Sequence, residues 1–208
     1  ILFNCFVTYI IAQKEANTWY FANKLGLDFN PTNGPITLSG SIMNALEGCA
    51  SISDKQTGQL LFYTNGLGVI NKNNMTMPNS TNLGGHNSST QSALIVPWPQ
   101  SDSLYYVFAT DAEAGIPYNT YGGASYSLVN MSLNGGLGDV VFAKKVLFKP
   151  SCEKLTAVKH CNGNDVWVIT HKWKSDEFYV YLITSLGIDT IPVISHSGTV
   201  QGDSINGS

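Results

Sequence analysis

The stretch that decides the fold is residues 47–66, EGCASISDKQTGQLLFYTNG. It opens with a polar residue, continues with small and apolar residues in alternation, and passes through a polar turn. It then ends in a run of bulky apolar residues closed by Thr and Asn. Alternation on both sides of a short polar segment predicts a β-hairpin with a first strand of small side chains and a second strand of large ones.

The same pattern occurs twice more along the chain, at residues 91–111 (QSALIVPWPQSDSLYYVFATD) and 153–171 (EKLTAVKHCNGNDVWVITH). A recurring unit of this size is the signature of a repeat architecture. Small first strands suit a crowded place, such as strands converging on the axis of a β-propeller, and bulky second strands fill the space between neighbouring sheets.

Each hairpin is followed by further strand-like segments, at 68–73, 124–133 and 177–185. The chain is therefore predicted to be all-β, a truncated fragment with about three blades of antiparallel strands of a partial, WD40- or YVTN-like β-propeller. The blades lie near 47–85, 91–140 and 153–195, and 112–123 is the candidate for an insertion. Three units cannot close a ring, so we expect further blades. A β-sandwich is the competing fold, but it does not explain why one unit recurs.

The two ends differ from the rest of the chain. Residues 1–12, ILFNCFVTYIIA, carry no charge and are too few to span a bilayer. They predict the apolar region of a secretory signal peptide at 1–16, although a buried first strand would have the same apolar composition. Residues 17–200 then form the partial propeller, and the polar segment 201–208 is a connector to a missing blade. We therefore expect the protein to be secreted or held on the outer cell surface.

Charge excludes several kinds of partner. Only 12% of residues are charged, the net charge is −3, and no basic run occurs, which argues against binding of nucleic acid. No other segment is apolar enough to insert into a membrane after removal of the signal. No Cys/His spacing predicts a zinc site, and no cofactor is expected.

The cysteine spacing argues against one disulfide and leaves another open. Cys152 and Cys161 flank a predicted strand at 153–159, which would separate them by about 20 Å, well beyond disulfide reach. Loss of the signal peptide would remove Cys5 and leave an odd number of cysteines. A bond between Cys49 and Cys152 stays open.

Polar residues recur at matching places of the three units. Glu47, Gln91 and Glu153 open the first strands and could form a ring of acceptors for a cation or for sugar hydroxyls. The alternative is that they bind neighbouring backbone N–H groups or pair with Lys55, Lys154 or Lys159, since buried carboxylates need such partners.

A second set of side chains closes the second strands, and these could converge on one face of the propeller: Asn65, Asp111 and His171. Aromatic side chains in turns could stack on sugars or could cover a neighbouring blade: Trp98, Tyr118 and Trp173. None of these sets has the carboxylate pairing or ligand spacing of a catalytic or metal site.

Residues 17–30, 44–66, 88–99, 126–140 and 153–171 together resemble the N-terminal propeller of large secreted Bacteroidetes proteins. These are gliding-motility-associated or PKD-domain proteins that end in a type IX secretion (type B) sorting domain. The resemblance implies export by type IX secretion and a further blade after this segment. The chain departs from the family pattern at Asn65, where Asp is common, and around 117–123, which is longer.

Two functions compete. The first is a non-catalytic extracellular or cell-surface interaction module that takes part in adhesion or binds a glycan or another protein. The second is a propeller-type polysaccharide hydrolase or lyase whose site is completed by missing blades. The chain contains no arginine, which argues against clamping of a substrate carboxylate in the manner of sialidases. We therefore expect no catalytic residue in this chain.

Overall fold

The computed structural model describes residues 13–112 and 122–200 of the chain. This described part is all-β and folds into four antiparallel sheets. Its only helical segment is one 3₁₀ turn, η1, at Asn134–Gly136.

The sheets are built from strands that follow one another in sequence. The first sheet has the order β1 (Thr18–Phe21), β2 (Leu25–Asp28), β3 (Ile36–Leu38). The second has β4 (Ala50–Ser53), β5 (Leu60–Thr64), β6 (Val69–Asn71). The third has β7 (Ala93–Pro97), β8 (Leu104–Thr110), β9 (Ala124–Asn130), β10 (Asp139–Phe148). The fourth has β11 (Ser151–Lys159), β12 (Val166–Lys172), β13 (Glu177–Thr184), β14 (Gly187–Ile188), with β15 (Val193–His196) also paired to β13.

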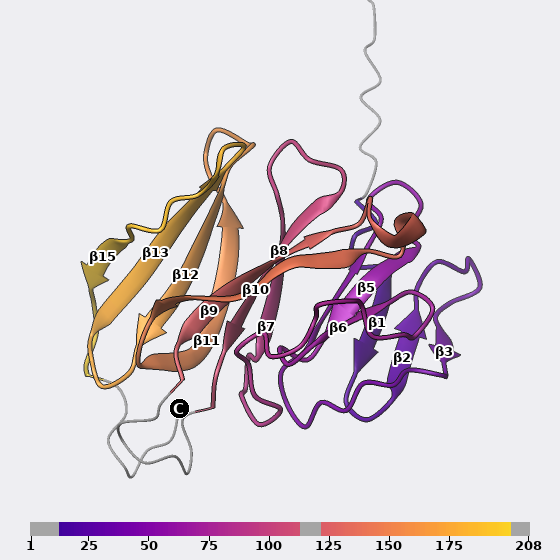
Figure 1. The fold of residues 1–208 in the computed structure, drawn as a ribbon, viewed down its shortest axis with the longest axis horizontal. Helices are drawn as coiled ribbons and strands as arrows, with labels where there is room; N and C mark the ends of the chain where they lie inside the picture. Colours follow the sequence, from indigo (N-terminus) through magenta and orange to yellow (C-terminus); the bar gives the residue numbers. More distant parts are fainter. Residues whose placement is uncertain (1–12, 113–121, 201–208) are drawn as a thin grey trace, which may run out of the picture.

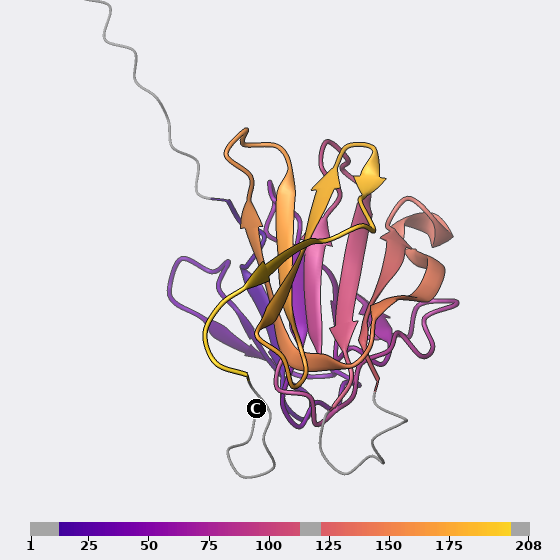
Figure 2. The ribbon, with the colours of Figure 1, turned by 90° about the vertical axis from the view of Figure 1, so that its left-hand side faces the viewer.

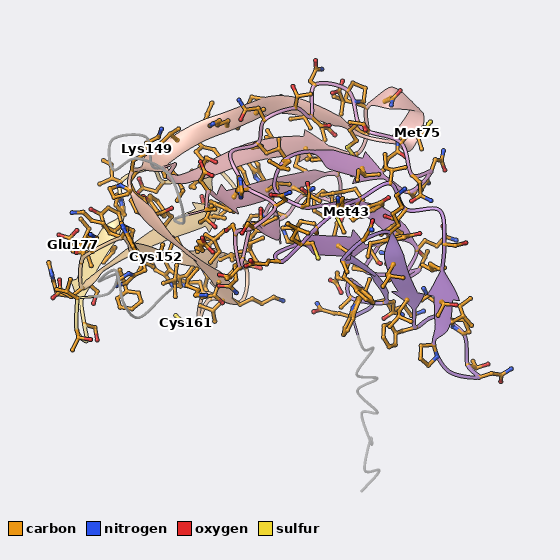
Figure 3. All side chains as sticks on the ribbon, turned by 90° about the horizontal axis from the view of Figure 1, so that it is seen from below. Met43, Met75, Lys149, Cys152, Cys161 and Glu177 are labelled. Atoms are coloured by element: carbon orange, nitrogen blue, oxygen red, sulfur yellow. The ribbon has the colours of Figure 1, made fainter. Side chains whose placement is uncertain are left out.

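The four sheets lie side by side in chain order, from indigo to yellow in Figure 1. Seen from below, they follow an arc with the first and last sheets at its two ends (Figure 3). The first strand of each sheet contacts the first strand of the next: β1 with β4, β4 with β7, and β7 with β11. In the second, third and fourth sheets, the turn that joins the first strand to the second lies at the same end of the molecule, at the top of Figures 1 and 2.

The three hairpins expected from the repeat are present as β4–β5, β7–β8 and β11–β12. The structure adds a sheet in front of them, β1–β3, which the repeat did not indicate. Its second strand, LGLD, is short and lacks the aromatic residues that mark the second strand of the other sheets. Strand β10 also extends beyond the expected end at 140. Of the expected insertion at 112–123, residues 113–121 lie outside the described residues.

Strand β8 shows how neighbouring sheets are held together. Successive side chains on a strand point to opposite faces. Tyr105 and Val107 accordingly pack into an apolar cluster shared with the second sheet, whereas Tyr106 and Phe108 pack into a cluster shared with the fourth. Both faces of the strand are therefore buried, and an unbroken apolar sequence is what such a position requires.

Each gap between neighbouring sheets holds one such cluster. Between the first and second sheets, Tyr20 stacks on Tyr63 with ring centroids 4.4 Å apart, beside Met43 and Ile70. Between the second and third, the ring of Phe62 meets that of Tyr105 edge-on at 5.5 Å. Three clusters thus join four sheets in series.

The two end sheets have one face that no described element covers. On the first sheet, Trp19 is 49% exposed and Leu25 is 54% exposed. On the fourth, Val158 is 53% exposed, and Trp167 and Val180 beside it are half-buried. In Figure 2 the fourth sheet faces the viewer, and no other sheet lies in front of it.

Gly48, just before β4, lies against the backbone just before β7, and its replacement tests the packing there. Its N–H donates to the Ser89 carbonyl at 2.9 Å, and a Cβ at this position would collide with the backbone of Ser92. We expect Gly48→Ala to lower the free energy of unfolding by about 1–3 kcal/mol through overpacking, measured by urea denaturation.

Gly163 provides the control for this substitution. It lies in a turn at φ +77° with nothing near its Cβ position, and asparagine tolerates that conformation. Gly163→Asn should leave the unfolding midpoint nearly unchanged. If both variants lose the same free energy of unfolding, close packing of the second and third sheets at Gly48 contributes little to stability.

Candidate functional site

Two of the predicted ligand residues, Gln91 and Glu153, bind the backbone across the junction of the third and fourth sheets. The N–H of Thr90 donates to Oε2 of Glu153 at 2.7 Å, and the N–H of Leu155 donates to Oε1 of Gln91 at 3.0 Å. Glu153 is buried. Both side chains therefore satisfy backbone donors, the alternative that burial of a carboxylate favours.

Glu47 lies in a different setting. It precedes β4, is exposed, and accepts a hydrogen bond from the Ser88 hydroxyl at 3.3 Å. Glu47, Gln91 and Glu153 thus occupy matching places in the sequence but not matching environments. Across residues 13–112 and 122–200, no three His, Cys, Asp or Glu side chains are grouped so that they could hold a metal ion.

Similar bonds from side chain to backbone occur at the other junctions. Between the first and second sheets, the N–H of Tyr20 donates to the Ser51 hydroxyl at 2.8 Å. Between the second and third, the Ser92 hydroxyl donates to the Asn65 carbonyl at 2.6 Å. The first bond links β1 to β4, and the second links the residue before β7 to the residue after β5. In both cases the elements belong to different sheets and share no ladder hydrogen bonds.

Glu153 offers a direct test of this structural role. We expect Glu153→Ala to lower the free energy of unfolding by about 1–3 kcal/mol, because the N–H of Thr90 loses its partner. Glu153→Gln keeps a carbonyl oxygen as acceptor and should cost less. Chemical denaturation measures both, and a larger loss for the glutamine variant would contradict the role.

The three residues predicted at the ends of the second strands, Asn65, Asp111 and His171, do not share a hydrogen-bond partner among the described residues. Asn65 donates through Nδ2 to the Asn44 carbonyl at 3.0 Å, and Asp111 accepts from the N–H of Ala112 at 2.9 Å. The Asn65 side chain thus binds the segment before β4, the Asp111 side chain binds the residue that follows it, and the two share no partner in the described part of the chain.

His171, the third member of that set, is buried against a cysteine. Its Nδ1 lies 3.2 Å from Sγ of Cys152, and its ring meets that of Phe178 edge-on at 4.6 Å. Burial lowers the pKa of His171, and the negative charge of Asp176 opposes that shift. Among the described residues, Cys49, Cys152 and Cys161 form no disulfide with one another, and Figure 3 shows Cys152 and Cys161 apart from each other.

The lowered pKa of His171 predicts how stability depends on pH. The unfolded chain, with an ordinary histidine pKa of about 6.5, binds the proton more readily than the folded chain. Stability should therefore fall as pH drops below about 6.5. Thermal melts at about pH 7.5 and about pH 5.5, which bracket that value, should show a smaller pH effect in His171→Gln. An unchanged effect would assign the acid sensitivity to other groups.

Of the aromatic residues proposed to stack on sugars, the structure describes Trp98 and Trp173. Trp173 is half-buried, and its Nε1 is buried with no hydrogen-bond partner among the described residues. Trp98 stacks on Tyr106 at 5.0 Å and donates through Nε1 to the Ser185 carbonyl at 3.1 Å, which joins the third sheet to the fourth. Tyr118 lies outside the described residues.

The structure reveals a polar pocket that the sequence did not indicate. It has a volume of about 240 Å³ and lies where the turn joining β4 to β5 faces the turn joining β7 to β8. Its lining residues are Glu15, Ser53, Asp54, Lys55, Gln56, Pro97, Ser101, Asp102 and Tyr105. Acidic residues in the matching turns of two successive repeats, Asp54 and Asp102, are the sequence signal that could have found it.

One ion pair and backbone hydrogen bonds connect the segments around this pocket. Lys55 Nζ lies 2.7 Å from Oδ1 of Asp102 and so bridges the two turns. The carbonyl of Glu15 accepts from the N–H of Ser53 at 2.8 Å, and the N–H of Lys14 donates to the Lys55 carbonyl at 3.4 Å. Lys14 and Glu15, which fall within the signal peptide expected from the sequence, therefore pack beside the end of β4, and this pocket persists after export only if the signal peptide ends before Glu15. Burial, together with the nearby carboxylates of Asp54, Asp102 and Glu15, raises the pKa of Tyr105 to about 12, so its hydroxyl stays protonated.

Comparison with known proteins gives no relative from which a function could be transferred. No protein-family model, curated protein or solved structure matches the chain. Within residues 13–112 and 122–200, there is no helix whose length and apolarity would let it cross a bilayer.

Proposed function

We propose that this chain is a segment of a β-propeller that acts as a non-catalytic binding scaffold of a secreted or surface-held bacterial protein. One observation carries the proposal: the first strands β1, β4, β7 and β11 contact one another in sequence, and each begins an antiparallel sheet. This order of sheets around a line of first strands is that of propeller blades.

The uncovered faces at the two ends support a propeller segment over a sandwich. In a sandwich, two sheets cover one another, whereas here four sheets stand in a row and each middle sheet is covered on both faces. A further blade on the outer face of the fourth sheet would bury Val158, Trp167 and Val180 as Phe62 and Tyr105 are buried inside the row.

The binding role rests on where the polar groups are used. Gln91, Glu153 and His171 serve the packing of the sheets, which supports a scaffold rather than a catalytic function for them. The turns at 54–59, 98–103 and 160–165 lie along the same edge of the row of sheets, at the top of Figures 1 and 2. Binding residues concentrate in turns that a rigid scaffold holds in place. An extracellular glycan or protein is the proposed partner.

A binding screen with the full chain tests this function. The chain should bind one or more glycans or surface proteins on an array and should release no reducing ends from polysaccharides. Replacing Gln56 and Asn164, exposed in two of the turns, with alanine should weaken binding about tenfold, which corresponds to about 1.4 kcal/mol.

The matched control replaces two exposed residues that precede β4, Asn44 and Glu47, with alanine. That variant should bind as the unchanged chain does. Loss of binding in the control, or hydrolysis of a polysaccharide by the purified chain, would overturn the proposal.

A further inference from the structure

We propose that the pocket between the second and third sheets binds an amino sugar, with its ammonium group held by Glu15 and Asp54. This rests on the proposed binding function and names a ligand for it, because residues 54–56, 101 and 102 of the lining belong to the turns at 54–59 and 98–103. The pocket itself is formed by two neighbouring sheets and needs no further blade. Its volume of about 240 Å³ lies below the range of pockets that hold drug-sized ligands, which suits a single sugar unit.

The charge of the pocket favours a cation. Three carboxylates line it (Glu15, Asp54, Asp102) against one ammonium group, that of Lys55. Lys55 is already paired with Asp102. The carboxylate of Glu15 has no hydrogen-bond partner within residues 13–112 and 122–200, so a net negative charge faces the cavity.

Asp54 has one oxygen left for a ligand. The N–H groups of Gln56 and Thr57 and the Thr57 hydroxyl all donate to Oδ1, at 3.0, 2.7 and 2.8 Å. These bonds lower the pKa of Asp54 and keep it ionised, and they fix the carboxylate in one orientation. Its Oδ2 receives no donor from the described residues.

A buried hydroxyl gives an independent indication of a ligand. Ser53 lines the pocket, is 1% exposed, and its Oγ has no hydrogen-bond partner among the described residues. A buried polar group without a partner is unfavourable, and native chains seldom leave one. The protonated Tyr105 hydroxyl lies in the same lining. Together, these groups match a ligand that carries both an ammonium group and hydroxyls.

The walls argue against a lysine side chain from a protein partner. Such a side chain would bring four methylene groups, which need apolar contact. Of the lining residues, Pro97 and Tyr105 carry an apolar or aromatic side chain, and the others are polar or charged. A sugar ring with hydroxyls on its edge suits these walls better.

Calorimetric titration of the full chain tests the assignment with four probes. Glucosamine should bind in the millimolar range, near the 4.1 kcal/mol that a Kd of about 1 mM represents. Glucose and N-acetylglucosamine, which lack the charge, and n-butylamine, which lacks the hydroxyls, should each bind at least about tenfold more weakly. Added salt should weaken glucosamine binding, because the charged groups are partly exposed.

Paired variants locate the site. Glu15→Gln should weaken glucosamine binding about tenfold, whereas Glu47→Gln, the same change at an exposed carboxylate outside this pocket, should leave it unchanged. Ser53→Ala should weaken binding without lowering the melting temperature, since no hydrogen bond within the described chain is lost. Tyr105→Phe preserves the ring packing and removes only the hydroxyl, so it should also weaken binding.

Three results would overturn the proposal. The first is no heat of binding with glucosamine. The second is equal binding of glucosamine and N-acetylglucosamine, or equal loss in Glu15→Gln and Glu47→Gln. The third is binding of n-butylamine as tight as that of glucosamine, which would make the pocket a receptor for a lysine side chain. The arrays report binding by all three turns, whereas calorimetry with Glu15→Gln reports on this pocket, because Glu15 lies outside the turns. Binding on the arrays without glucosamine binding would therefore overturn this assignment and leave the proposed function standing.

Discussion

The structure depends on apolar side chains that project from both faces of the same strand. In β8, Tyr105 and Val107 point one way and Tyr106 and Phe108 point the other, so that a single strand joins two apolar clusters. β5 does the same with Phe62 and Tyr63. A sheet with one apolar face can only form a pair, whereas sheets with two apolar faces can extend into a row. The row of four sheets, the bonds at their junctions and the pocket between two of them all follow from this property.

Polar side chains add hydrogen bonds between the sheets that the apolar clusters join. The first strands of neighbouring sheets approach closely but share no ladder, so their backbone donors and acceptors need other partners. Ser51, Ser92, Gln91 and Glu153 supply them from side chains. This explains why small and polar residues are mixed in the first strands, and why residues that resembled ligands in the sequence are structural in the fold.

The hairpins could be predicted from the sequence because the information for them is local. Alternation and turn residues within 47–66, 91–111 and 153–171 indicate β4–β5, β7–β8 and β11–β12 without reference to the rest of the chain. The first sheet could not be found in this way, because LGLD is too short for its alternation to stand out. The partner of Glu153 could not be found either, since Thr90 lies 63 residues away and meets it only through the packing of two sheets. The pocket combines Glu15, residues 53–56 and residues 97–105, and no local pattern connects these segments.

The serial arrangement of the clusters has a consequence for how the protein loses its structure. Each cluster belongs to two neighbouring sheets, so the stability of the row is close to a sum of nearest-neighbour terms. The first and fourth sheets are held from one side and the middle two from both, which gives the ends the lowest cost of opening. Amide protons of β8 should then exchange with solvent more slowly than those of β2 or β13. Unfolding would proceed inward from the two ends of the arc, and any blade that covers an end would slow that process.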